Sequence, residues 1–486
     1  MTDNYDPTRT LKRPSFGFIM IGGALVGSAI RDLRLANELA ERGHPVHVFW
    51  TIDRTPVMEL HPDIRQHWLF NSGRYNGFIM KLLFIRRGYF AADDYLGRFL
   101  CRVIPLKFRM WLYQNGVGSF DIVRWAMNGL IRHVCQGVER DRGVFKSFAK
   151  KIERERITHL IPNLSVFGPF CDEVKKYVSS PPSYLVTYQG YEVYGNYAFD
   201  LGLGEQLYQR LKETAERSDF PAVVVSADYG ERVQRDLGLR SDQLEVIPAC
   251  ITLPEQTELQ SAKKILCDLY GDKYDPRIPL LTYMGRQDSE KGIDLLLYAA
   301  KMLNERGVPF QLAVSGTTAW GQVYKQACHQ IAANLRLPVL TADYLTVEQM
   351  SALYRASRCI AYPSIHREPF GMVPVEAMAQ GTPIVVPDAG GVSKLPFQGD
   401  RQAGLTFRMW DTADLARQLE RLLLDDALHA QFSNNARRIA EQYSVSNVCD
   451  QMLDLIGLSA YKRSKQTPVQ SEEAPDESFQ KTRVAV

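Results

Sequence analysis

The sequence is poor in cysteine and contains no cysteine motif. Eight cysteines are scattered over 486 residues, and no two of them form a C-x-x-C pair. Zinc sites and dithiol redox sites are therefore not expected. Several of the cysteines stand in apolar runs, as reduced core residues do, and this favours a cytosolic protein.

A long apolar segment is also missing. The first ten residues are polar, and the first apolar run, residues 16–21, is too short to span a membrane and is followed by glycines. We therefore expect neither a signal peptide nor a transmembrane helix. The net charge is only +3, from 58 basic and 55 acidic residues, which argues against a general nucleic-acid-binding protein.

The order of the predicted elements indicates two α/β domains. The chain is longer than the size at which a single core stops growing. A strand over 16–21, the pair Gly22 and Gly23, a helix over 28–42 and a strand over 45–50 form the start of a parallel, doubly wound sheet. The glycines do not fit a strict G-x-G-x-x-G pattern, and no acidic residue ends the second strand, so a dinucleotide site is not expected.

The next strand patterns lead to a predicted hinge. Buried-type strands are predicted at 157–162, 184–188, 223–226 and 244–247. A polar and charged stretch over 254–279 follows and marks the hinge. A second array of strands then begins at residues 280–284.

Residues 359–392 form the stretch around which the second half is organised. An apolar strand at 359–362 leads into a Pro-Ser turn and a loop that holds Glu368. A helix is predicted to begin near Met372, because Pro374 is tolerated only in the first turn of a helix. The free amides of that first turn favour an anion such as a diphosphate.

Two carboxylates flank the start of this helix. Glu368 lies just before it, and Glu376 lies about one turn into it. Each carboxylate can accept hydrogen bonds from sugar or ribose hydroxyls, and Gly371, Gly390 and Gly391 carry no side chain that would block a ligand. The alternative is that both glutamates merely complement the helix dipole.

Two cations stand at the start of the second strand array. Gly285 and Arg286 follow the strand over 280–284, and Lys291 precedes the next predicted helix. A strand end and a helix start are suitable positions for neutralising a leaving diphosphate. The alternative is an ordinary surface lysine and a salt-bridged arginine.

The combined motifs resemble those of a known family. The matching residues are Glu368, Pro369, Phe370, Gly371, Glu376, Ala377, Met378, Ala379, Gly381, Pro383, Gly390 and Gly391. This string is similar to the E-x7-E signature of retaining glycosyltransferases of the GT-B fold, in glycosyltransferase family 4. The spacing of Arg286 and Lys291 is similar to that family's Gly-Arg…Lys-Gly motif.

The resemblance implies a donor site in the second domain. It implies that Glu376 binds the ribose hydroxyls and that Glu368 lies beside the donor sugar. Arg286 and Lys291 would hold the diphosphate, and Tyr344-Leu345 would lie against the base. The amides that would hold the diphosphate and the sugar belong to Phe370, Gly371, Met372 and Val373.

The resemblance also implies a role for two segments of the first domain. Gly22 and Gly23 match the glycine-rich loop that lies near the donor phosphates and the acceptor. Gln189 and Gly190 follow a predicted strand and match the acceptor-side His-Gly-Tyr-Asp segment, with Gln189 in place of the usual histidine. A glutamine does not titrate near neutral pH, so it can hydrogen-bond a hydroxyl but cannot act as a general base.

The segment over residues 74–113 mixes basic and aromatic residues. Between Arg74 and Arg109 there are eight basic and two acidic residues. Such a mixture suits peripheral contact with an anionic membrane surface. The alternative is a set of helices packed on the first sheet with their basic residues in water.

These observations predict an α/β protein of the GT-B class, with two Rossmann-like domains. The first domain would cover residues 1–253 and be completed by a C-terminal helix over 443–462 that crosses back to it. The second, nucleotide-sugar-binding domain would cover 254–442, and 463–486 would be a disordered tail.

The predicted function is metal-independent transfer of a sugar from a nucleotide sugar to an acceptor hydroxyl, and the resemblance implies retention of the configuration at the anomeric carbon. Arg286, Lys291 and Glu368 would be the catalytic residues. A UDP-sugar is the expected donor, although the sequence does not separate it from GDP- or ADP-sugars, and no cofactor or metal is expected. The expected setting is cell-envelope polysaccharide or glycolipid synthesis at the cytoplasmic side of a membrane. The alternatives are a small soluble acceptor and a non-catalytic nucleotide-sugar-binding protein.

Overall fold

The chain forms two compact units. The computed structural model describes residues 13–20, 27–51, 58–69, 130–140, 142–317, 322–461 and 484–485. The first unit comprises Met1–Val223 and Val233–Glu245, and the second comprises Val224–Arg232 and Val246–Val486. The predicted loop at Gly22 and Gly23, the basic segment over 74–113, and residues 463–483 and 486 of the predicted tail lie outside the described residues.

The first unit is built on a five-stranded parallel sheet. Its strand order is β3-β2-β1-β4-β5, and each neighbouring pair is parallel. The strands are β1 (Phe16–Met20), β2 (Val46–Trp50), β3 (Arg65–Trp68), β4 (His159–Pro162) and β5 (Ser183–Tyr184). Every residue of β1 and β2 is buried, as expected for central strands of a sheet covered on both faces.

The first half of the chain also contains helices and a second, smaller sheet. The helices of this part are α1 (Gly27–Glu41), α6 (Arg142–Glu155), α7 (Gly168–Val174), α8 (Glu192–Asp200), α9 (Gly204–Glu216) and α10 (Ala227–Leu237). The smaller sheet has the order β6-β7-β8, with strands β6 (Thr187–Tyr188), β7 (Ala222–Val224) and β8 (Leu244–Val246). The predicted single strand over 184–188 is therefore two short strands, β5 and β6, in different sheets.

The second unit is built on a six-stranded parallel sheet. Its order is β11-β10-β9-β13-β14-β17, and all its pairs are parallel. The strands are β9 (Leu280–Met284), β10 (Gln311–Ser315), β11 (Val339–Ala342), β13 (Cys359–Ala361), β14 (Ile384–Pro387) and β17 (Gly404–Phe407). A two-stranded hairpin is formed by β15 (Phe397–Gln398) and β16 (Arg401–Gln402).

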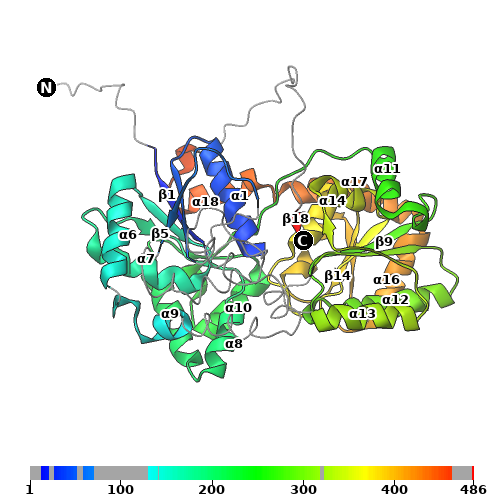
Figure 1. The fold of residues 1–486 in the computed structure, drawn as a ribbon, viewed down its shortest axis with the longest axis horizontal. Helices are drawn as coiled ribbons and strands as arrows, with labels where there is room; N and C mark the ends of the chain where they lie inside the picture. The colour runs from blue at the N-terminus through cyan, green and yellow to red at the C-terminus, as the bar shows by residue number, and fades with distance from the viewer. Residues whose placement is uncertain are drawn as a thin grey trace, which may run out of the picture. The chain divides into compact units, whose positions relative to one another are not determined.

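Helices cover both faces of the second sheet. Figure 1 shows α12, α13 and α16 together on one side of the sheet and α11, α14 and α17 on the other. The helices of this unit are α11 (Leu259–Tyr270), α12 (Ile293–Glu305), α13 (Gln322–Asn334), α14 (Val347–Ala356), α15 (Met372–Ala379), α16 (Thr412–Leu424), α17 (Asp426–Glu441) and α18 (Val445–Leu455). Leu296, Leu419 and Phe432 are among the buried side chains of its core. In the described part of the chain, no helix combines the length and the apolar character needed to cross a membrane.

Two backbone pairings hold the C-terminal part of the chain. Residues 443–461 lie in the second unit, where the Ile251 amide donates a 2.9 Å hydrogen bond to the Tyr443 carbonyl and the Val445 amide donates one of 2.8 Å to the Ile251 carbonyl. That this segment completes the first domain stays a prediction. Val484–Ala485, in the region predicted to be disordered, forms strand β18. It pairs in antiparallel fashion with β12 (Tyr344–Leu345).

Buried histidines should make the first unit sensitive to acid. Burial, together with the neighbouring His67, lowers the pKa of His47 on β2 to about 4. Burial also lowers the pKa of His159 on β4 to about 4. Below pH 6.5 the unfolded chain binds protons that these histidines in the folded unit do not bind. The contribution of these two histidines to the free energy of unfolding is therefore fully present above pH 6.5. It is lost as the pH falls towards 4, by up to about 1.4 kcal/mol per pH unit for each histidine.

The measurement is thermal unfolding followed between pH 7.5 and pH 4.5. His47→Gln should reduce the loss of melting temperature over this range, whatever its effect at pH 7.5. The same substitution at His329, which is exposed on α13, is the matched control. Identical pH profiles for wild type and His47→Gln would contradict this account.

Candidate functional site

Two turns of the second unit are brought into contact at the ends of β9 and β13. The first turn, residues 285–292, ends at Gly292, which has φ +64° and caps α12. A Cβ atom at Gly292 would lie 2.2 Å from the carbonyl oxygen of Pro363 in the second turn. The Ile365 amide donates a 3.1 Å hydrogen bond to the carbonyl of Glu290. Only a glycine at 292 therefore allows the two turns to approach so closely.

A buried ion pair joins the two turns. The Lys291 ammonium pairs with Glu368 Oε1, and their side chains are 12% and 11% exposed. The Ser364 hydroxyl donates a 3.1 Å hydrogen bond to the same carboxylate oxygen. Lys291 Nζ also lies 3.4 Å from the hydroxyl of Tyr362 and 5.6 Å from the centre of its ring. The structure thus brings together two residues that the sequence analysis predicted to share a site.

The partners of Glu368 keep it ionised. Burial by itself would raise the pKa of this carboxyl group, but the Lys291 ammonium, His366 and the Ser364 hydroxyl outweigh it, so the pKa lies below its usual value. Glu368 therefore carries its negative charge throughout the neutral pH range. Sequence reasoning had not identified Ser364 and Tyr362, whose roles depend on a contact between distant turns.

Arg286 is engaged by two carboxylates of its own turn. Its guanidinium pairs with Asp288 and, at 2.9 Å, with Glu290. Burial would lower the pKa of Arg286, but the two carboxylates raise it above its ordinary value. The hydroxyl of Tyr283, on β9, donates a hydrogen bond to the carbonyl of Arg286 and so fixes the turn to the end of this strand. The predicted cation is therefore present beside Lys291, and its charge is already balanced within the turn.

The first turn of α15 has no side-chain cap. Gly371 is its N-cap residue, with φ +102°, and it has no side chain that could accept a hydrogen bond from the first amides. These are the amides predicted to hold a diphosphate, in a segment that runs from Phe370 to Val373. The loop before the helix is fixed from the other side, because the Gly391 amide donates 2.8 Å to the carbonyl of Glu368.

Glu376 and the Tyr344-Leu345 segment lie in different environments. Glu376 is half-buried on α15, where the Tyr354 hydroxyl donates a 3.3 Å hydrogen bond to its Oε2 atom. Tyr344 is 61% exposed and Leu345 is 2% exposed. Their backbone is paired with β18, in the register Tyr344 with Ala485 and Leu345 with Val484. The predicted base-binding segment is therefore next to the C-terminal end of the chain.

The predicted acceptor-side residues lie in the first unit. Gln189 directly follows β6 and is half-buried. Its Nε2 atom donates to Asp32 Oδ2 at 3.2 Å and to the carbonyl of Asn163 at 3.1 Å. Gly190 has φ +139°, and no atom lies within 4 Å of the position that a Cβ would take.

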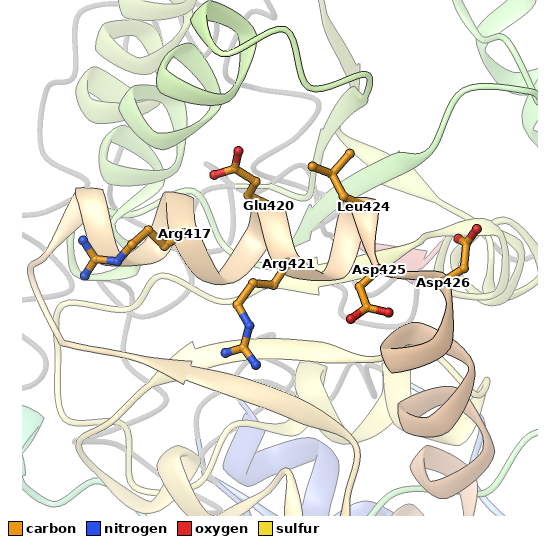
Figure 2. Close-up of a pocket in the computed structure, with 6 residues that line it drawn as sticks. All are labelled: Arg417, Glu420, Arg421, Leu424, Asp425 and Asp426. Carbon is orange, nitrogen blue, oxygen red and sulfur yellow. The ribbon is translucent and has the colours of Figure 1, made fainter.

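A surface depression along α16 is not part of this site. Figure 2 shows that it is lined by Arg417, Glu420, Arg421, Leu424, Asp425 and Asp426. Glu420 is paired with Arg306 at 2.7 Å, and Asp426 with Arg358 at 2.6 Å. The depression contains none of the predicted site residues, and these ion pairs are typical of a solvated helix face. Over the described ranges, no three His, Cys, Asp or Glu side chains are gathered as metal ligands would be.

The match to a known family lies within the second unit. Residues 274–439 match the family model described as glycosyl transferases group 1. A D-inositol 3-phosphate glycosyltransferase of Rhodococcus erythropolis is 32% identical over 185 residues, which are 37% of this chain and 41% of that protein. The alpha-D-kanosaminyltransferase of Streptomyces kanamyceticus is 31% identical over 224 residues, 46% of this chain and 53% of that protein. The alignments thus span about half or less of these curated relatives.

Comparisons with solved structures cover both units. The sucrose-phosphate synthase of Thermosynechococcus elongatus has a TM-score of 0.65 and 19% identity, over 92% of this chain and 98% of that one. Anabaena HepE, in complex with UDP and glucose, has a TM-score of 0.61 and 16% identity, over 91% and 99%. These neighbours are GT-B glycosyltransferases, and the predicted fold class is confirmed: the chain has the GT-B fold.

Breaking the buried ion pair should destabilise the second unit. Glu368→Gln or Lys291→Met alone leaves one charge buried without its partner, which typically costs about 3–5 kcal/mol. The double variant removes both charges, so it should be more stable than either single variant. Denaturant unfolding of the four proteins gives the coupling free energy. Single-variant losses that simply add in the double variant would show that the pair is not energetically coupled.

Proposed function

We propose that this chain is a glycosyltransferase that moves a sugar from a nucleotide sugar to an acceptor hydroxyl. The observation that carries the proposal is the buried Lys291–Glu368 pair beside the uncapped first turn of α15. Both elements lie inside residues 274–439, the part that matches the glycosyl transferases group 1 family. A cation, an ionised carboxylate and free helix amides at one point suit a diphosphate attached to a sugar.

The proposed donor is a UDP-sugar. HepE, which shares the fold, was solved with UDP and glucose. Glu376, held by Tyr354, would accept hydrogen bonds from the ribose hydroxyls, and Glu368 from a hydroxyl of the sugar. The alternatives are GDP- and ADP-sugars, because the described side chains that we assign to the donor contact phosphate and hydroxyl groups, which all three donors share.

The proposed reaction retains the configuration at the anomeric carbon. The acceptor oxygen forms a bond to that carbon from the face that the diphosphate leaves, and the carbon–phosphate-oxygen bond breaks. The hydroxyl proton passes to the departing diphosphate. Arg286, Lys291 and the amides of α15 stabilise the negative charge that grows on the leaving group, which is electrostatic catalysis by preorganised groups. Because protein cations supply this charge, transfer should continue in the presence of EDTA.

The charge balance of the site adds a condition for donor binding. Arg286 and Lys291 supply two positive charges, whereas their partners Asp288, Glu290 and Glu368 supply three negative charges. A diphosphate must therefore displace a carboxylate from a cation. The Arg286–Glu290 contact is the most accessible of the three pairs, since its side chains are 26% and 39% exposed. We propose that Arg286 exchanges Glu290 for the diphosphate.

The proposed setting is synthesis of a cell-envelope polysaccharide or glycolipid on the cytoplasmic side of a membrane. The support is the basic and aromatic sequence of residues 74–113, which suits anionic lipid. WaaG, another structure of the same fold with a TM-score of 0.55, is described as a glycosyltransferase involved in lipopolysaccharide biosynthesis. A small soluble acceptor is the alternative.

A second candidate function is binding of a nucleotide sugar without transfer. The observation that favours it is Gln189, which stands where the family has a histidine and cannot accept a proton near neutral pH. Release of UDP from a UDP-sugar, with or without an acceptor, separates the two candidates. Tight binding without any release would support the second.

Two variants test donor binding and turnover separately. A panel of UDP-, GDP- and ADP-sugars, with magnesium or EDTA, should stabilise the protein with one nucleotide only. The stabilisation would be about 2.7 kcal/mol at 100 times the dissociation constant, and Glu376→Ala should abolish it. Arg286→Ala should lower turnover by about 100-fold or more. The same substitution at Arg277, an 87% exposed arginine of the same unit, is the control; normal turnover in Arg286→Ala would contradict the mechanism.

Removing the competing carboxylate should strengthen donor binding. Glu290→Gln keeps the size of the side chain but no longer attracts Arg286, so the dissociation constant for UDP should fall by about two- to fivefold. The gain should shrink in 1 M salt, where charges are screened. Isothermal titration measures both values. Weaker UDP binding in Glu290→Gln would mean that this carboxylate orients Arg286 for the ligand and does not compete with it.

A further inference from the structure

The first unit contains a buried polar cluster that connects three elements. Asp32 on α1 is fully buried and pairs with Arg31 at 2.8 Å. Asn163, which directly follows β4 and is also fully buried, donates from Nδ2 to Asp32 Oδ2 at 2.8 Å. Gln189, which directly follows β6, donates to the same oxygen at 3.2 Å. The cluster therefore gathers at strand ends, the edge where ligands of parallel sheets collect.

The cluster determines which way the Gln189 carboxamide faces. Both partners of its Nε2 atom are acceptors, the Asp32 carboxylate and the carbonyl of Asn163. A carboxamide turned by 180° would place oxygen against oxygen and lose both hydrogen bonds. The Oε1 atom must therefore face away from Asp32. Gln189 is half-buried, and the adjoining Gly190 leaves open space where a side chain would be.

One oxygen of the cluster lacks a donor among the described residues. Asn163 Oδ1 is buried and has no hydrogen-bond partner among the described residues. An unsatisfied buried acceptor costs about 1–3 kcal/mol, so a group that donates to it would be held favourably. Asn163 Oδ1 is enclosed, whereas Gln189 is half-buried, so a ligand that complements Gln189 Oε1 must bring a donor. Sugar and polyol hydroxyls are such donors.

We propose that Asp32 and Asn163 are positioning residues that hold the Gln189 carboxamide so that its Oε1 atom accepts a hydrogen bond from a hydroxyl of the acceptor. This inference rests on the proposed glycosyl transfer and specifies its acceptor side. Gln189 orients the hydroxyl and does not deprotonate it, because a carboxamide does not take up a proton near neutral pH. The proton then leaves with the diphosphate as the acceptor oxygen bonds to the anomeric carbon, which balances the reaction.

The test compares acceptor kinetics in variants of the full-length protein. Transfer from UDP-glucose is measured to whichever of D-inositol 3-phosphate and octyl β-D-glucoside the wild type uses. Gln189→Met keeps the length of the side chain but cannot hydrogen-bond, so the KM for the acceptor should rise about tenfold. The UDP-induced thermal shift should be retained. Gln209→Met, the same change at an exposed glutamine of this unit, should behave as wild type.

Two further variants distinguish positioning from packing. Gln189→His can donate one ring N–H to Asp32 and present its other nitrogen as an acceptor, so it should keep the acceptor KM within about threefold. It should also add a pH dependence near pH 6.5 that the wild type lacks. Asp32→Asn can donate to Gln189 and permits the reversed carboxamide, so it should raise the acceptor KM as Gln189→Met does.

The outcomes separate this inference from the proposed function. If the wild type transfers glucose but Gln189→Met leaves the acceptor KM unchanged, the inference is overturned and the proposed function stands. If Gln189→Met and Gln189→His lose the same activity and neither shows a new pH dependence, the role is packing and the inference is again overturned. If the wild type releases no UDP from any nucleotide sugar, the proposed function itself is overturned.

Discussion

The second unit depends on one constraint, the burial of Lys291 and Glu368 against each other. Burying either charge without its partner would cost several kcal/mol of desolvation free energy, on the order of 3–5 kcal/mol, and the attraction between the two charges offsets this cost. The pair fixes two turns that are far apart in the sequence, and Gly292 allows the backbones to meet. The first turn of α15 begins at Met372, four residues after Glu368. Its position therefore follows from the position of the ion pair.

The strands of the fold could be predicted where they are buried on both faces. Most positions of β1, β2, β9 and β14 are apolar, as is typical of strands that are covered on both faces, so these strands could be predicted. The run over residues 184–188 could not be divided from the sequence, because all five residues are buried and none is a glycine or a proline. Which sheet each joins depends on its neighbours, β4 and β7, and these come from distant parts of the chain.

The sequence predicts which residues form the candidate site, but it does not predict which of their side chains are in contact. Arg286, Lys291 and Glu368 stand in recognisable local motifs, so their presence near one another was predictable. The sequence did not indicate that Lys291 pairs with Glu368, or that Asp288 and Glu290 neutralise Arg286, because side-chain pairing depends on the turn geometry. A partial signal for the first-unit cluster did exist: Asp32 is, with Arg31 and Glu38, one of three charged residues among the buried residues of α1.

Glu368 and Arg286 both keep their charge near neutral pH. Glu368 stays ionised because the Lys291 ammonium outweighs the effect of burial, and the two carboxylates beside Arg286 hold its pKa above an already high value. Gln189 has no proton to exchange. A site made of such groups can orient a hydroxyl and stabilise a leaving anion, but these residues cannot relay a proton. Fixed dipoles and charges of this kind need no reorganisation during reaction, so the proton of the acceptor must travel with the substrates.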